Sequence, residues 1–237
     1  MAGRDAILGK IRRRLEGREG RADAAAVEAR IAGHQANLIP RRGQVPLEER
    51  IALFEAAAET LSATLERVAG AEQVPAAVAR YLRRQNLPLD VRRAPDPELA
   101  ALPWASEPLL SVAEGRAEAT DAVSVTPVLA AVAETGTLAL ASGPETPTSL
   151  NFLPETHIAV VRTSQLVGTY EEVFQRLRTR FGAGSMPRTL NFVTGPSRTG
   201  DIEQKIELGA HGPRRLHLLL VDDGAGESEG AAGDGPR

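Results

Sequence analysis

The chain has 237 residues, of which 42% are hydrophobic and 25% charged, and its formal net charge is −3. This composition is typical of a globular protein, and the negative charge argues against nucleic acid as a partner of the whole surface. There is no cysteine, which excludes disulfides, thiolate catalysis and a cysteine-held iron–sulfur cluster in this chain. No run of about 18 apolar residues predicts a membrane span. The charged first twenty residues lack the apolar core of an export signal, so we expect a cytoplasmic location.

Residues 1–88 are predicted to form an N-terminal helical region that packs on the core. Its first helix, Arg4 to Leu15, has apolar residues on one face and basic residues on the other. That pattern indicates either an arm for nucleic acid or an acidic partner, or a solvated helix that docks by its apolar face.

From Leu47 onward, apolar residues recur with the spacing of a heptad and predict one helix that reaches Val68. This seam is formed by Leu47, Ile51, Phe54, Ala58, Leu61, Leu65 and Val68. It would serve either as a coiled-coil dimer contact or, with only three heptads, as a face packed against the protein itself. A second helix is expected at 75–85.

Residues 89–223 are predicted to be an α/β core. We expect strands at 123–125, 138–141 and 157–162, because each is a short apolar run of the kind buried in sheets. Pro127 suits the first turn of a helix over 128–133, and a second amphipathic helix is predicted at 170–181. The glycine-rich, acidic residues 224–237 predict a disordered tail.

The stretch from Thr189 to Asp222 is typical of a strand–helix–strand unit. It has an apolar run at 190–193, a capping Ser197 or Thr199, helical spacing up to Gly209, and a second apolar run at 216–221. Such a crossover implies parallel strands. The predicted fold is therefore α/β, with an open, mostly parallel sheet flanked by helices and an N-terminal helical extension.

Two hydroxyl-rich loops are the candidate ligand-binding segments, because open parallel sheets bind ligands where strands turn into helices. Their residues would bind a phosphate or carboxylate through hydroxyls and backbone N–H groups, although the same residue types also serve as caps and turns. The candidates are Thr135, Gly136, Thr137 and Ser142 in the first loop, and Gly195, Ser197, Thr199 and Asp201 in the second.

Glu134 and His211 are the candidate catalytic residues. Glu134 lies in a turn rather than on a solvated helix face, and His211 follows the predicted helix end, where the dipole favours its charged form. Equally, Glu134 would accept turn N–H groups and His211 would cap the last carbonyls. Asp201 follows a GxxxxG spacing where a phosphate-binding loop needs lysine, so that nucleotide-hydrolysis motif is absent. The remaining histidines have no metal-ligand spacing, so no metal is expected.

Three segments together resemble the lactate utilization protein C family, which belongs to the LUD-domain group. They are AETGTLAL at 133–140, Ser142-Gly143-Pro144, and TGPSRTGDIEQKIELGAHGPRRLHLLLVDD at 194–223. The resemblance implies a fold similar to the ribose-5-phosphate isomerase and CoA-transferase group. It also implies action with lactate utilization proteins A and B, which hold iron–sulfur clusters, in oxidising L-lactate to pyruvate.

The resulting hypothesis is a cluster-free subunit of an L-lactate-oxidising complex that binds a small anion such as lactate. The alternative is a free-standing isomerase or acyl/CoA-transferase-like enzyme, with Glu134 as base or nucleophile. Both hypotheses place the two hydroxyl-rich loops together at one rim of the sheet. The family supplies no settled catalytic residues, so the site residues remain candidates.

Overall fold

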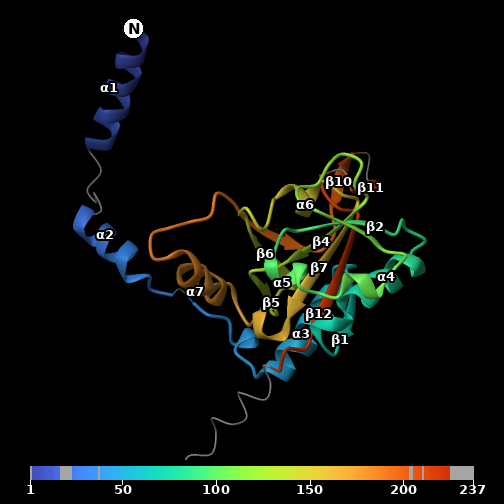
Figure 1. Cartoon of the computed structure of the whole chain (residues 1–237). Coiled ribbons are helices and arrows are strands. Elements are labelled where there is room, and N and C mark those ends of the chain that lie inside the picture. The colour runs from blue at the N-terminus through green and yellow to red at the C-terminus, as the bar shows by residue number, and fades with distance from the viewer. Residues whose placement is uncertain (1, 17–22, 37, 203–204, 210, 225–237) are drawn as a thin grey trace, which may run out of the picture. The chain divides into compact units, whose positions relative to one another are not determined.

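The computed structural model describes residues 2–16, 23–36, 38–202, 205–209 and 211–224 (Figure 1). The chain divides into two compact units, residues 1–38 and 39–237, which are described separately. The predicted disordered tail at 224–237 lies outside the described residues, except for Gly224. In the part of the chain that is described, no helix is long and apolar enough to span a membrane.

The first unit contains α1 (Ala2–Glu16) and α2 (Ala24–Gly33). The Asp23 side chain caps α2 by accepting a hydrogen bond from the N–H of Ala25 at 3.1 Å. His34 ends this helix in the left-handed conformation, with φ of 44°. The N-terminal helical extension of the prediction is therefore present.

Within the second unit, six parallel strands form one sheet in the order β1-β12-β7-β4-β2-β3. The strands are β1 (Thr64–Val68), β2 (Asp90–Arg93), β3 (Ser111–Glu114), β4 (Val123–Pro127), β7 (Thr156–Arg162) and β12 (Arg215–Val221). Central strands β7 and β12 are buried along nearly their whole length, as their mostly apolar sequences predicted. The predicted open, mostly parallel sheet is confirmed.

A second sheet has the order β8-β5-β6-β9, and its β5–β6 and β6–β9 pairs are antiparallel. The strands are β5 (Ala130–Val132), β6 (Thr137–Ala141), β8 (Leu166–Val167) and β9 (Leu190–Thr194). The helix predicted at 128–133 is wrong, because this run forms β5. Ala131 faces one apolar cluster and Val132 another, so the segment is buried on both sides as a strand.

The helix predicted between Ser197 and Gly209 is also wrong. This stretch forms an antiparallel hairpin of β10 (Arg198–Ile202) and β11 (Lys205–Leu208). Moreover, β9 belongs to the second sheet and β12 to the first, so the two flanking strands do not pair. The predicted strand–helix–strand unit is therefore wrong, although both of its strands exist.

Helix α3 (Leu47–Thr60) ends earlier than the heptad spacing predicted. Ser62 has φ of 62°, a left-handed conformation that ends the helix, and Leu65 and Val68 belong to β1. The seam residues Leu47, Ile51, Phe54 and Ala58 are buried against the protein's own sheets. The intramolecular alternative for this seam is thus correct.

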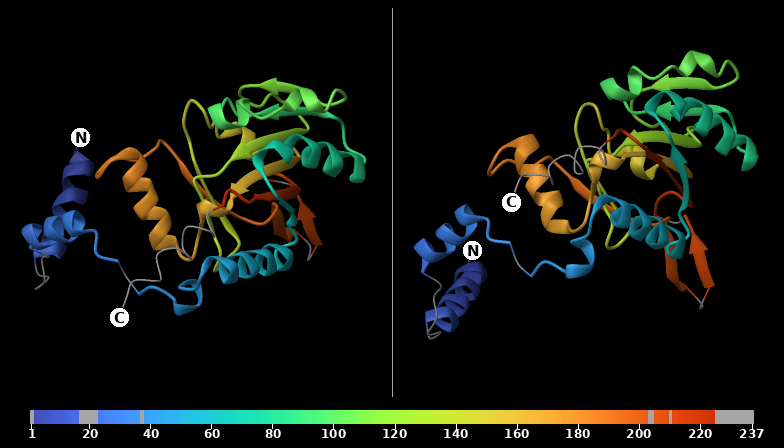
Figure 2. Two further views of the ribbon diagram at one scale, coloured as in Figure 1. Left: turned by 60° about the horizontal axis from the view of Figure 1, so that its bottom comes forward. Right: turned by 90° about the horizontal axis from the view of Figure 1, so that it is seen from below.

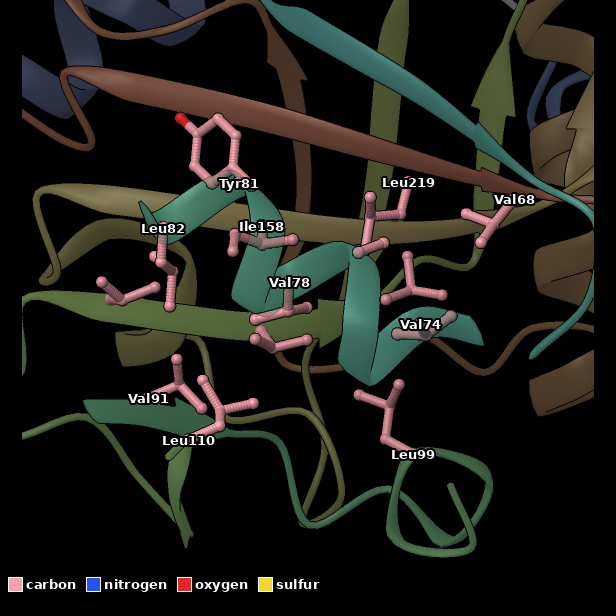
Figure 3. Packing of buried hydrophobic residues seen from close by; sticks show 14 of the residues in the cluster. Val68, Val74, Val78, Tyr81, Leu82, Val91, Leu99, Leu110, Ile158 and Leu219 are labelled. Carbon is pink, nitrogen blue, oxygen red and sulfur yellow. The ribbon is translucent and has the colours of Figure 1, made fainter. Parts of the chain in front are cut away.

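The main sheet is covered on both faces (Figure 2). On one face, α4 (Val74–Arg84) packs through Val78 and Leu82 on Ile158 and Leu219, as Figure 3 shows. On the other face lie α3 and the second sheet. Helix α7 (Tyr170–Phe181) covers the far side of the second sheet. The remaining short helices are α5 (Pro97–Ala100), α6 (Ser149–Phe152) and the 3-10 turns η1 (Arg41–Gly43), η2 (Ala71–Gln73), η3 (Trp104–Ser106) and η4 (Thr163–Gln165).

Candidate functional site

The two hydroxyl-rich segments of the prediction meet where β6 begins and β9 ends. Thr137 pairs with Thr194 in the β6–β9 ladder, and their hydroxyls are 2.8 Å apart. The Thr137 hydroxyl also lies 2.7 Å from that of Thr135 and 2.9 Å from that of Tyr170, the first residue of α7. These four side chains form a hydroxyl cluster whose members bond to one another.

Gly136 and Gly195 lie beside this cluster, and both pack against the C-terminal end of α3. Gly136 has φ of +66°, and a Cβ atom there would lie 3.1 Å from the Ala57 Cβ and from the Leu61 Cδ1. Gly195 has φ of +81°, and its Cβ would lie 3.0 Å from the Leu61 carbonyl oxygen. Glycine at both positions therefore permits a left-handed turn and a close approach to the helix.

Glu134 is held by an arginine from the segment before α3. Its side chain is 5% exposed, and its Oε1 accepts a hydrogen bond of 2.7 Å from the Arg42 Nε and lies 2.5 Å from an Arg42 terminal nitrogen. Arg42 itself is 69% exposed. This arrangement closes the carboxylate to solvent and fixes the 41–43 turn to the second sheet. Sequence reasoning missed Arg42, because 92 residues separate the partners and no local pattern marks the pair.

Ser142 lies at the opposite end of β6 from the hydroxyl cluster. Its Oγ accepts a hydrogen bond of 2.9 Å from the N–H of Thr189, and its own N–H donates to the Thr189 carbonyl. At about 3.4 Å per residue, five residues of strand separate Ser142 from Thr137 by about 17 Å. Ser142 is therefore too far from Thr135 and Thr137 to share a ligand of the size of lactate with them.

Ser197 and His211 lie in loops that hydrogen-bond to each other on either side of the β10–β11 hairpin. The Ser197 N–H donates to the Pro213 carbonyl at 2.8 Å, and the Ser197 Oγ accepts from the His211 N–H at 3.4 Å. His211 is exposed and follows a strand, so the helix-dipole reason for its charge is wrong. Thr199 and Asp201 lie in β10, but their side chains do not belong to the part of the chain that the structure describes.

Two other histidines are buried. His157 shares one hydrogen bond of 2.7 Å with the Thr126 hydroxyl, and its Nδ1 has no partner. Burial lowers the pKa of His157 to about 4, and burial likewise lowers the pKa of His217 to about 4. Both side chains are therefore neutral at pH 7. Across the described residues, no three metal-ligating side chains gather into a group.

The larger clefts lie away from the hydroxyl cluster. One of about 660 Å³ runs along β1 between side chains of α3 and α4. Another of about 480 Å³ lies at the carboxyl ends of β1 and β12, where Val68 and Leu220 meet the first turn of α3. Parallel sheets usually bind ligands at that second edge. None of the candidate residues predicted from sequence lines either cleft.

The parallel sheet covered on both faces defines this chain as an α/β protein, with an antiparallel sheet as a second layer. Residues 51–221 match the family model of the LUD domain, so the chain belongs to the LUD domain family. A solved DUF162 family protein from Deinococcus radiodurans is similar in structure, with a TM-score of 0.57 and 26% sequence identity. That match covers 75% of this chain and 99% of the Deinococcus protein.

Curated relatives share a shorter stretch. Lactate utilization protein C from Shouchella clausii is 36% identical over 92 residues, which is 39% of this chain and 40% of the relative. Lactate utilization protein C from Bacillus subtilis is 36% identical over 93 residues, which is 39% of each chain. The match thus spans about two fifths of the length of these relatives.

Proposed function

We propose that this chain is the cluster-free subunit of a complex that oxidises L-lactate to pyruvate. The observation that carries the proposal is the similarity to several proteins named lactate utilization protein C, within a chain that has the LUD domain. The proposed partners are proteins of the lactate utilization A and B type, which would hold the iron–sulfur clusters.

The absence of cysteine supports this division of roles. Oxidation of L-lactate to pyruvate releases two electrons and two protons, and an iron–sulfur cluster that accepts electrons is usually held by cysteine thiolates. This chain has none. Its contribution in the proposal is to assemble the complex and to bind a small anion beside Thr135, which is partly exposed, whereas Thr137 is fully buried.

The free-standing transferase or isomerase is the less favoured hypothesis. A carboxylate that acts as base or nucleophile must reach its substrate. The Glu134 side chain is 5% exposed and is paired with Arg42, so this geometry favours a structural role.

Native affinity purification of the full chain from its source cells tests the proposal. We expect cysteine-rich proteins in the eluate, non-haem iron in stoichiometric amount, and lactate-dependent dye reduction by the eluate. The chain purified alone should reduce no dye. Lactate oxidation by the lone chain, or an eluate that lacks iron and lactate activity, would refute the proposal.

A further inference from the structure

The cleft along β1 has the size of a small-molecule site. Its volume is about 660 Å³, within the range of about 300–1,000 Å³ usual for ligand pockets. β1 is an edge strand of the main sheet, so the cleft is bordered by α3 on one side and α4 on the other. The lining includes Glu55 and Glu59 from α3, and Arg80, Tyr81 and Arg84 from α4.

Three of the charged residues that line this cleft are already paired within the protein. Arg80 forms an ion pair with Glu66 on β1. Glu55 accepts two hydrogen bonds from Arg67, of 2.5 and 2.6 Å. These pairs fasten β1 to α4 and to α3, respectively, and leave no net charge.

Glu59 and Arg84 are different, because they line the same cleft without a partner. Among the described residues, neither side chain forms an ion pair within 4.0 Å or a side-chain hydrogen bond. They are therefore not in contact with each other, and the cleft presents one free carboxylate and one free guanidinium. Both side chains are exposed, so a ligand has access to them.

The same cleft is lined by a stacked pair of rings with spare hydrogen-bonding capacity. The Tyr81 and His217 rings stack with centroids 3.8 Å apart and planes within 8°. The His217 Nδ1 lies 2.9 Å from the Thr64 hydroxyl, whereas its Nε2 is buried without a hydrogen-bond partner. Buried polar groups of this kind are usually paired, so a ligand donor or acceptor at this wall would stabilise the site.

We propose that this cleft binds a small zwitterion of the α-amino acid type, with its carboxylate on Arg84 and its ammonium on Glu59. A simple anion would meet repulsion from Glu59, and a simple cation would meet repulsion from Arg84. A molecule with both charges satisfies the two residues at once. This inference goes beyond lactate utilization and does not depend on it.

Calorimetric titration of the full chain with single L-amino acids tests the inference, with L-lactate and ethylamine as one-charge comparisons. We expect saturable binding of at least one amino acid and at least about tenfold weaker binding of ethylamine. Any binding of L-lactate should be unaffected by Arg84→Gln, because the proposed lactate site lies outside this cleft. Arg84→Gln and Glu59→Gln should each weaken amino acid binding about tenfold or more, a loss of about 1.4 kcal/mol. The matched controls are Arg83→Gln, whose arginine pairs with Glu107 outside the cleft, and Glu49→Gln on α3; both should bind normally.

Nitrogen NMR of the His217 ring gives a second measurement, because its signal should move when the amino acid binds. No binding by any amino acid at millimolar concentration would overturn the inference. Amino acid binding that is unchanged by Glu59→Gln would also overturn it. The inference would also be overturned if Arg84→Gln left amino acid binding unchanged and the His217 signal did not move, because the ligand would then lie elsewhere.

Discussion

Replacing Gly136 by alanine separates a packing role for the 134–137 turn from a ligand-binding role. Gly136 has φ of +66°, and an alanine in this left-handed conformation costs about 1–2 kcal/mol. The new Cβ would also lie 3.1 Å from the Leu61 Cδ1 and 3.2 Å from the Ala57 backbone carbon. Overpacking of a close contact adds about 1–3 kcal/mol, so we expect Gly136→Ala to lower the free energy of unfolding by about 2–5 kcal/mol.

Equilibrium urea unfolding of the full chain measures this loss. Gly184→Ala is the matched control, because Gly184 has φ of +78° and a Cβ atom there would meet no heavy atom within 4 Å. That control should lose only the conformational cost of about 1–2 kcal/mol. In a Leu61→Ala background one close contact disappears, and Gly136→Ala should then cost less than it does in the parent chain.

The comparison of Gly136→Ala with Gly184→Ala can refute the packing of the 134–137 turn on α3. If Gly136→Ala and Gly184→Ala lose the same free energy, with or without Leu61, the turn is not packed against α3. A loss of ligand binding without a loss of stability would then favour a ligand role for Gly136.

Three further changes test other contacts. Arg42→Ala should lower the free energy of unfolding by about 1–3 kcal/mol, because it leaves the buried Glu134 unpaired; adding Glu134→Gln should recover part of the loss in the same urea assay, and no recovery contradicts the pair. In the unfolded chain His157 and His217 bind protons below about pH 6.5, whereas in the folded chain burial keeps them neutral down to about pH 4. The free energy of unfolding should therefore fall by up to about 3 kcal/mol per histidine as the pH is lowered over that range. His217→Phe should remove about half of this pH dependence, and an unchanged slope would show that His217 titrates normally. Ser142→Ala should cost about 1 kcal/mol without altering binding of a small anion at Thr135, whereas a binding defect would show that the two positions share a ligand.

The parallel strands were predictable because their burial leaves a local trace. Residues 157–162 and 216–221 are short, mostly apolar runs, a pattern that suits a strand covered on both faces. Helices α4 and α7 were equally predictable from their one-sided apolar spacing. In these elements the local pattern and the tertiary environment agree.

The errors lie where one pattern fits two structures. The run at 128–133 is short and apolar, which suits a buried helix as well as a strand, and only burial between α7 and the main sheet made it β5. The 198–208 stretch has apolar residues at helical spacing, yet it forms a hairpin. The heptad seam continued past Thr60 by coincidence, since Leu65 and Val68 are spaced correctly but belong to β1.

The candidate site was also predictable only in part from the sequence. Residue types alone indicated that the Thr135–Thr137 and Thr194–Ser197 segments are rich in hydroxyls, and β6–β9 pairing brings Thr137 and Thr194 together. They could not indicate that Arg42 pairs with Glu134, whereas the strand predicted at 138–141 already separated Ser142 from Thr137.

By itself, the sequence determined the family, the absence of thiol chemistry and the buried strands, because motifs, residue types and apolar runs are local properties. Only the tertiary structure decided which strands pair, where α3 ends, and that Glu59, Arg84 and His217 line one cleft. The reason is physical: pairing and clefts depend on contacts between residues far apart in the chain, and the free energy of those contacts outweighs local preference.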